Sequence, residues 1–194
     1  MFKVTIPRCD LVMIGGSAGS IDVLLSMLPA LKPGFKGVVV LVLHRKRYDD
    51  AVLASLFTEK AKFPVKEAEE KEPLKPGAVY LAPADYHLLI EKDHSFSLDY
   101  SEKIHYCRPS IDVSFESAAD VFGSRMAAIL LSGANADGVD GLKAVKSKGG
   151  YTIVQSPDFA VVDYMPKQAL QHAPVDKIMH EHETTQLLNM LLHG

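Results

Sequence analysis

The chain has 194 residues, of which 47% are hydrophobic and 23% are charged, and its formal net charge is -3 at pH 7. This length is enough for one domain with a buried core, and the composition excludes a fibrous, disordered or membrane-embedded protein. The slight negative charge argues against a general nucleic-acid-binding protein, which would need a basic surface.

Residues 1–10, MFKVTIPRCD, lack the apolar stretch that marks a signal peptide. The longest purely aliphatic run, Val38–Leu43, is far too short to cross a bilayer. We therefore expect a cytoplasmic protein that does not insert into a membrane. We also expect residues 1–194 to form a single domain.

Residues 10–31 predict a buried strand, a glycine-rich turn and an amphipathic helix. The strand is Leu11–Ile14, a short continuous apolar run typical of a central parallel strand. The turn is GGSAG at residues 15–19, with Ser17 at its apex. Ser20 is the expected N-cap of the helix and Pro29 marks its end.

Ser17 lies within the pattern G-x-S-x-G, which in hydrolases presents a serine hydroxyl to substrate. A helix N-terminus beside it favours negative charge, as an acyl-transfer nucleophile requires. Two other interpretations of this stretch stay open: an anion-binding turn, and a serine that only caps the helix.

The next elements continue the alternation of strand and helix. GVVVLVLH is a second apolar strand that ends on His44, and a helix capped by Asp49 or Asp50 runs up to Pro64. Residues 65–75 are highly charged and predict a short edge strand and a solvated loop. AVYLAP is a further apolar strand, and residues 86–100 predict an antiparallel β-hairpin that turns around Lys92 and Asp93.

Residues 101–108 predict an irregular loop that contains His105 and Arg108, followed by a helix opened by Pro109. The strand MAAILLSG then runs into a second glycine-rich turn, residues 133–138. A helix, the strand YTIVQ, a short helix at 164–173 and an amphipathic helix at 184–193 complete the chain. This order predicts an α/β fold with a doubly wound, mostly parallel sheet and helices on both faces.

In such sheets, ligands bind outside the carboxyl ends of the strands, where the strand order reverses. Ser17, His44 and Asp137 all follow predicted strands. They supply the nucleophile, the base and the orienting acid of a serine hydrolase. Alternatives remain for two of them: His44 can bond a backbone carbonyl, and Asp137 can form a turn while Asp140 takes the acid role.

Two other classes of site fit the sequence poorly. A dinucleotide-binding turn would need glycine at Ser17, or at Ala18 and Asp22, and no phosphate-binding P-loop pattern is present. The cysteines, Cys9 and Cys107, have no metal-type spacing, so we expect two free thiols and no metal site.

Several ordered motifs resemble one known family, the catalytic domain of the CheB protein-glutamate methylesterases of bacterial chemotaxis. They are IGGSAGSIDVL around Ser17, the strand ending in His44, PGAVYLAPADYHLLI, RPSIDVSFESAA, LLSGANADGVDGLKAVKSKGG and TIVQSPDFAVVDYMPKQAL. The resemblance implies hydrolysis of glutamyl methyl esters on cytoplasmic chemoreceptor helices, and deamidation of selected glutamines, without a metal or organic cofactor. It aligns Ser17, His44 and Asp137, rather than Asp140, with the family's triad.

The resemblance also implies backbone oxyanion donors near the two glycine-rich turns, for which the candidates are Ala18, Gly19 and Ala134. Arg45 opens a basic cluster, residues 45–47, that is a candidate docking site for an acidic receptor helix. The residues beside the triad depart from the family: Ala18-Gly19-Ser20 replaces Thr-Gly-Gly, and Gly133-Ala134-Asn135 replaces Gly-Met-Gly.

Two alternatives to a chemoreceptor methylesterase therefore stay open. One is a binding or regulatory domain of the same fold, and the other is an esterase for a different substrate. Family members commonly carry a phosphoreceiver domain before the catalytic domain, and we expect none within this sequence.

Overall fold

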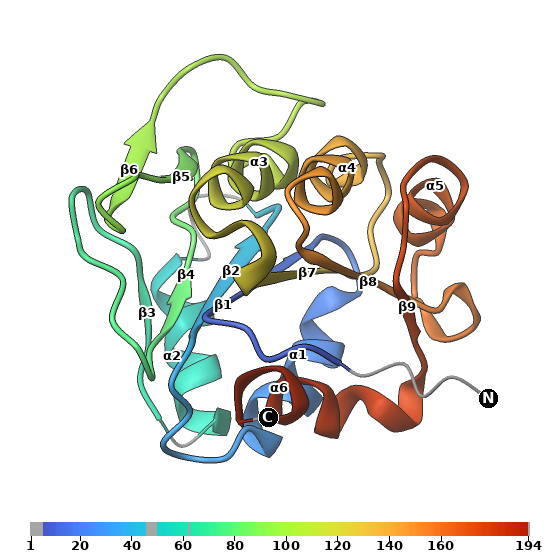
Figure 1. The fold of residues 1–194 in the computed structure, drawn as a ribbon, viewed down its shortest axis with the longest axis horizontal. Coiled ribbons are helices and arrows are strands. Elements are labelled where there is room, and N and C mark those ends of the chain that lie inside the picture. Colours follow the sequence, from blue (N-terminus) through green and yellow to red (C-terminus); the bar gives the residue numbers. More distant parts are fainter. Residues whose placement is uncertain (1–5, 46–49, 62, 194) are drawn as a thin grey trace.

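A computed structural model of the chain describes residues 6–45, 50–61 and 63–193 (Figure 1). Its main sheet has seven strands in the order β3-β4-β2-β1-β7-β8-β9, and all neighbouring pairs are parallel. The strands are β1 (Leu11–Gly16), β2 (Val38–Leu43), β3 (Val65–Glu67), β4 (Val79–Leu81), β7 (Met126–Leu130), β8 (Tyr151–Gln155) and β9 (Lys177–Met179). The predicted doubly wound α/β fold is confirmed.

A separate antiparallel pair, β5 (His87–Ile90) and β6 (Phe96–Asp99), confirms the predicted hairpin. The helices are α1 (Ser20–Ala30), α2 (Asp50–Ala61), α3 (Ile111–Phe122), α4 (Val139–Ser147), α5 (Tyr164–His172) and α6 (Thr184–His193). Short 3₁₀ turns are η2 (Gly123–Arg125), η3 (Pro157–Phe159) and η4 (Glu181–Glu183). Helices α1, α2 and α6 cover one face of the sheet, and α3, α4 and α5 cover the other (Figure 1).

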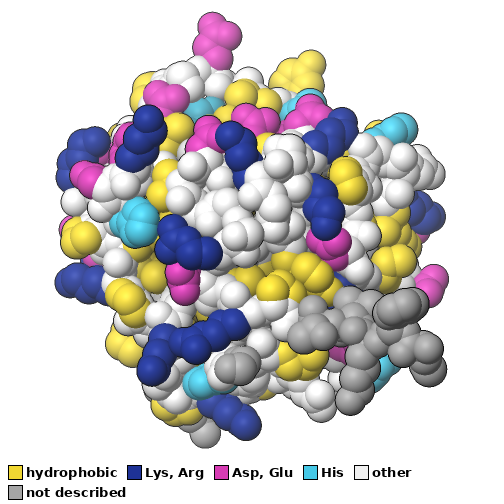
Figure 2. Space-filling view, in the orientation of Figure 1, with side chains coloured by type: hydrophobic (Ala, Val, Ile, Leu, Met, Phe, Trp, Pro, Cys, Tyr) yellow, Lys and Arg dark blue, Asp and Glu magenta, His cyan; other side chains and the backbone are white. Residues whose placement is uncertain are grey.

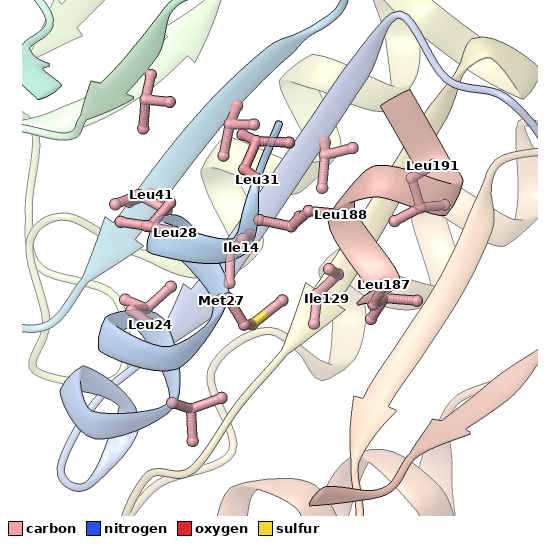
Figure 3. Close-up of a cluster of buried hydrophobic side chains, with 14 of the residues drawn as sticks. Ile14, Leu24, Met27, Leu28, Leu31, Leu41, Ile129, Leu187, Leu188 and Leu191 are labelled. Atoms are coloured by element: carbon pink, nitrogen blue, oxygen red, sulfur yellow. The ribbon is translucent and has the colours of Figure 1, made fainter. Parts of the chain in front are cut away.

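The continuous apolar strands reflect burial on both faces. Along β1, Val12 and Ile14 belong to the core under α1, α2 and α6, whereas Leu11 and Met13 belong to the core under α3, α4 and α5. Because successive side chains of a strand point to opposite faces, a strand between two helix layers needs an apolar residue at every position. Figure 3 shows the first core, where Leu24, Met27 and Leu28 of α1 meet leucines of α6.

One local expectation was wrong, and one strand was not predicted. The N-cap of α1 is Gly19, not Ser20, because the chain turns there with a φ of 82°, which glycine adopts without strain. Ser20 is the first helical residue, and its hydroxyl donates to the Ser17 carbonyl at 2.6 Å. Strand β9 was not predicted at all. The helix expected after Asp49 or Asp50 begins at Asp50, and Asp49 lies outside the described residues.

Strand order reverses between β1 and β7. From β1 the chain adds β2 on one side, and it later adds β7 on the other side. The loops after these two strands are the two glycine-rich turns found in the sequence. The fold therefore brings the turns at residues 15–19 and 133–138 to one point, where such sheets bind ligands.

Leu188 tests the packing of α6 on α1. Its side chain is 1% exposed, so replacing it with alanine should lower the free energy of unfolding by about 2–5 kcal/mol through lost burial and a new cavity. Met190 lies on the same helix and is 43% exposed, so Met190→Ala should change stability by about 0.5 kcal/mol or less. Urea unfolding measures both, and equal losses would contradict this packing.

Candidate active site

Ser17 lies where the two glycine-rich turns touch. Its backbone N–H donates to the Ser132 carbonyl at 2.8 Å, which joins the turn after β1 to the strand end of β7. A Cβ added at Gly133 would lie 3.1 Å from the Ser17 Cβ and 2.5 Å from the Met165 Cε, so the second turn packs closely against Ser17. The half-buried Ser17 side chain is thus fixed against the second turn.

His44 extends β2 by one residue, because its N–H donates to the Gly16 carbonyl at 3.1 Å. Its Nε2 lies 2.7 Å from the Oδ2 of Asp137, a residue that is fully buried. The structure therefore joins the predicted base to the predicted acid across 93 positions of sequence. Asp140 is exposed and contacts Lys143 at 2.7 Å, so it is not the partner of His44.

The Asp137 carboxylate is surrounded by donors from the start of α3. It accepts the backbone N–H groups of Ile111 (2.7 Å) and Asp112 (3.0 Å) and the hydroxyl of Ser110 (2.9 Å). Burial alone would raise the pKa of Asp137, but the hydrogen bonds from His44 and from the α3 amides outweigh it and hold that pKa below its usual range. Asp137 is therefore an anion, and His44 carries its proton on Nε2.

Asp112 makes the reciprocal contact. Its Oδ1 accepts the N–H groups of Gly138 (2.8 Å) and Gly141 (2.7 Å) at the start of α4. Burial raises the pKa of Asp112 to about 7, against the lowering effect of the Gly141 amide and with a further rise from the Asp137 charge. Asp137 thus caps the start of α3, which contains Asp112, and Asp112 caps the start of α4, which follows Asp137.

The second ring nitrogen of His44 faces a residue that was not predicted for the site. The Cys107 Sγ lies 3.4 Å from His44 Nδ1, and the side-chain amide of Asn135 donates to the same sulfur at 3.2 Å. Burial lowers the pKa of His44, but its hydrogen bonds to Asp137 and Cys107 outweigh burial and raise this pKa to about 9. Both cysteines are free thiols, as predicted.

Ser17 and His44 lie on the wall of one pocket of about 480 Å³. Its other lining residues are Ala18, Gly19 and Arg45 and the apolar side chains of Ile21, Val52, Leu53 and Leu56. In the described part of the chain, no direct hydrogen bond joins Ser17 to His44. The proposed nucleophile and base thus line the same pocket.

The remaining predicted residues differ in what they offer to the pocket. Ala18 and Ala134 are exposed, and their backbone N–H groups have no acceptor among the described residues, so both are open to a ligand. Gly19 packs closely, since an added Cβ would lie 2.5 Å from Val161. Arg45 is only 5% exposed at its side chain, where it pairs with Glu67 and donates to the Ala82 carbonyl at 2.8 Å.

Arg45 therefore acts chiefly within the fold, and residues 46–47 of the predicted basic cluster lie outside the described residues. On the face in Figure 2, Lys and Arg are mixed with Asp and Glu rather than gathered into one patch. In the residues that the structure describes, no helix is long and apolar enough to cross a membrane. The same residues contain no group of three metal-binding side chains.

The chain is similar to known proteins in both sequence and fold. The family model for the CheB methylesterase matches residues 12–188. A putative protein-glutamate methylesterase/protein-glutamine glutaminase of Leptospira interrogans is 39% identical over 178 residues, which are 92% of each chain. A protein-glutamate methylesterase/protein-glutamine glutaminase of Carboxydothermus hydrogenoformans is 38% identical over 88% of this chain, which spans 52% of that relative.

Among solved structures, the Thermotoga maritima CheB methylesterase catalytic domain superposes with a TM-score of 0.88. It is 33% identical in sequence, and the match covers 93% of this chain and 97% of that one.

The contact between His44 and Asp137 makes a prediction for titration. We expect the His44 imidazole to titrate near pH 9 in nitrogen-detected NMR, above its ordinary value of 6.5. In Asp137→Asn the ring loses its carboxylate, so its pKa should fall toward or below 6.5, because burial disfavours the charged ring. Asp140→Asn, three positions along, should leave it near 9. A wild-type His44 that titrates at 6.5 would contradict the assigned contacts.

Proposed function

The chain belongs to the CheB methylesterase family, and from this premise we propose that it removes methyl esters from glutamyl side chains of chemoreceptors through Ser17, His44 and Asp137. The protein is a carboxylic ester hydrolase, the class to which its named relatives belong. The observation that carries the assignment to these residues is the pocket that Ser17 shares with His44, whose far nitrogen donates to a buried carboxylate.

In the proposed reaction, the Ser17 hydroxyl attacks the ester carbonyl and His44 Nδ1 accepts its proton. Asp137 keeps the other proton on Nε2 and stabilises the imidazolium that forms. His44 then protonates the departing methanol, and water hydrolyses the acyl-enzyme by the same base. Substrate binding brings the Ser17 hydroxyl within hydrogen-bond reach of Nδ1, as catalytic contacts commonly tighten in the substrate complex.

Negative charge on the carbonyl oxygen needs donors beside Ser17. Ala18 and Ala134 are exposed residues whose backbone N–H groups lack an acceptor in the described chain, and they belong to the two turns that meet at Ser17. We assign the oxyanion to these amides, with Gly19 as the conformational hinge of the first turn. A donor of this kind contributes about 100- to 1,000-fold in rate.

The substrate side of the pocket is apolar. Ile21 is 39% exposed and Val52 is 71% exposed, and both line the pocket that contains Ser17. These side chains suit the apolar stripe of a receptor helix, with its methylated glutamate directed at Ser17. We therefore propose methylated cytoplasmic receptor helices as the partner and the cytoplasm as the place of action. The paired Arg45 shapes the pocket wall.

The relatives' names also include protein-glutamine glutaminase activity. A glutamine side chain passes through the same acyl-enzyme, with ammonia rather than methanol as the leaving group. Deamidation of selected receptor glutamines is therefore a second reaction that the same three residues can perform.

Ser17→Ala should reduce methanol release from methylated receptor fragments by about 10,000-fold or more, because no other group in the mechanism attacks the ester. Ser26→Ala is a matched control: Ser26 is an exposed serine on α1 whose hydroxyl donates to the Asp22 carbonyl at 3.2 Å. It should keep nearly full activity. Release that persists in a folded Ser17→Ala protein would overturn the assignment of the nucleophile.

The pH profile follows from the raised pKa of His44. Only the neutral ring can accept the serine proton, so kcat/KM should rise about tenfold per pH unit below that pKa and level off near pH 9. Initial rates of methanol release, corrected for the Ser17→Ala background at each pH, measure this. A plateau that begins near pH 6.5 would contradict the raised pKa of His44 and therefore its contacts with Asp137 and Cys107.

A further inference from the structure

Cys107 is in the position, relative to His44, that a nucleophile takes relative to its base. Its sulfur is 3.4 Å from Nδ1, while Nε2 is bonded to Asp137. Because the pKa of His44 is about 9, its ring is mostly the imidazolium at pH 7, and this positive charge lies beside the sulfur. A thiol, a base and a group that orients the base are the parts of a cysteine nucleophile.

Two further features support reactivity at this sulfur. The Asn135 side-chain amide donates a hydrogen bond to it, which holds the sulfur beside the His44 ring. Cys107 is half-buried and lines an open pocket of about 310 Å³, together with His44, Lys103 and Tyr106.

We propose that Cys107 is a covalent modification site for small carbon electrophiles, and that an adduct there silences the esterase because Cys107 and Ser17 depend on the same nitrogen of His44. In the modification step, the Cys107 thiol gives up its proton to solvent beside the charged His44 ring, and the sulfur forms a bond to carbon. The carbon–halogen bond of a haloacetamide breaks, and the halide leaves with the electron pair. The loss of esterase activity on modification rests on the proposed function, whereas the modification itself does not.

Cys9 is the internal reference, because it is the only other cysteine in the sequence. It is 2% exposed, and burial together with the nearby Asp10 charge raises the pKa of its thiol to about 12. A buried thiol of this kind reacts slowly. Selective labelling of one cysteine in the intact protein therefore reports the environment of Cys107 directly.

The test treats the folded protein with iodoacetamide at pH 7 and follows each cysteine by peptide mass spectrometry. Cys107 should react at least about tenfold faster than both Cys9 and free N-acetylcysteine, and His44→Ala should remove most of that advantage. Ser17→Ala should label at the wild-type rate, since Ser17 has no part in the step. The comparison with N-acetylcysteine needs no variant, so it holds even if His44→Ala fails to fold.

Methanol release is measured in parallel on the same samples. Loss of wild-type activity should match the fraction of Cys107 alkylated, while Cys107→Ala should keep the same activity before and after treatment. Labelling of Cys107 no faster than N-acetylcysteine would overturn the modification site, and full alkylation with undiminished release would overturn the silencing. If untreated protein releases no methanol, the proposed function fails, and the labelling rates still decide the assignment of Cys107.

Discussion

The geometry of this site depends on two buried carboxyl groups, Asp112 and Asp137. Each accepts hydrogen bonds from the start of the helix that the other belongs to or precedes. Asp137, which precedes α4, accepts the free amides at the start of α3, while Asp112, in the first turn of α3, accepts those at the start of α4. Each helix start thereby gains a carboxyl oxygen that accepts its free amides, at the end where the helix dipole favours negative charge. The same contacts bring the two helices close, and Gly141 allows this because an added Cβ would lie 2.7 Å from the Phe115 Cβ.

These contacts also determine the charge of Asp137 and its effect on His44. Among the described residues, the His44 ring, the Ser110 hydroxyl and two backbone amides of α3 donate to it, so its charge is stabilised although the residue is fully buried. An anion in that position fixes the tautomer of His44 and raises its pKa, against the effect of burial. The acid, the base and the sulfur of Cys107 form one coupled chain, and it begins in the backbone of α3 rather than in the pocket.

Sequence patterns predicted the layers of the fold and most of its elements, because an apolar strand between two helix layers has an unambiguous signature. They also placed Ser17, His44 and Asp137 at one sheet edge, since the carboxyl ends of parallel strands adjoin. Strand β9 was not predicted because it has only three residues, of which only Met179 is buried. Ser20 was taken as a cap because sequence preference cannot reveal that Gly19 adopts a positive φ.

Contacts between side chains of distant loops were beyond the reach of periodicity. Cys107 stands in an irregular loop, and no spacing relates it to His44, 63 positions earlier. Asp112 was not singled out in the sequence, and only the fold reveals that its carboxyl group, in the first turn of α3, accepts amides at the start of α4. The basic cluster after His44 suggested a surface patch, whereas Arg45 is buried against Glu67.

Asp137 binds the amides at the start of α3, and Asp112, within α3, binds the amides at the start of α4. Neither helix start can therefore fray without breaking contacts of the other. The amide protons of Ile111, Asp112, Gly138 and Gly141 are bonded across the interface between α3 and α4 rather than within one helix. They should therefore become accessible to solvent exchange in one cooperative opening. The same opening would release Asp137 and so disorient the His44 ring. The starts of α3 and α4 would then unfold together as one subglobal unit.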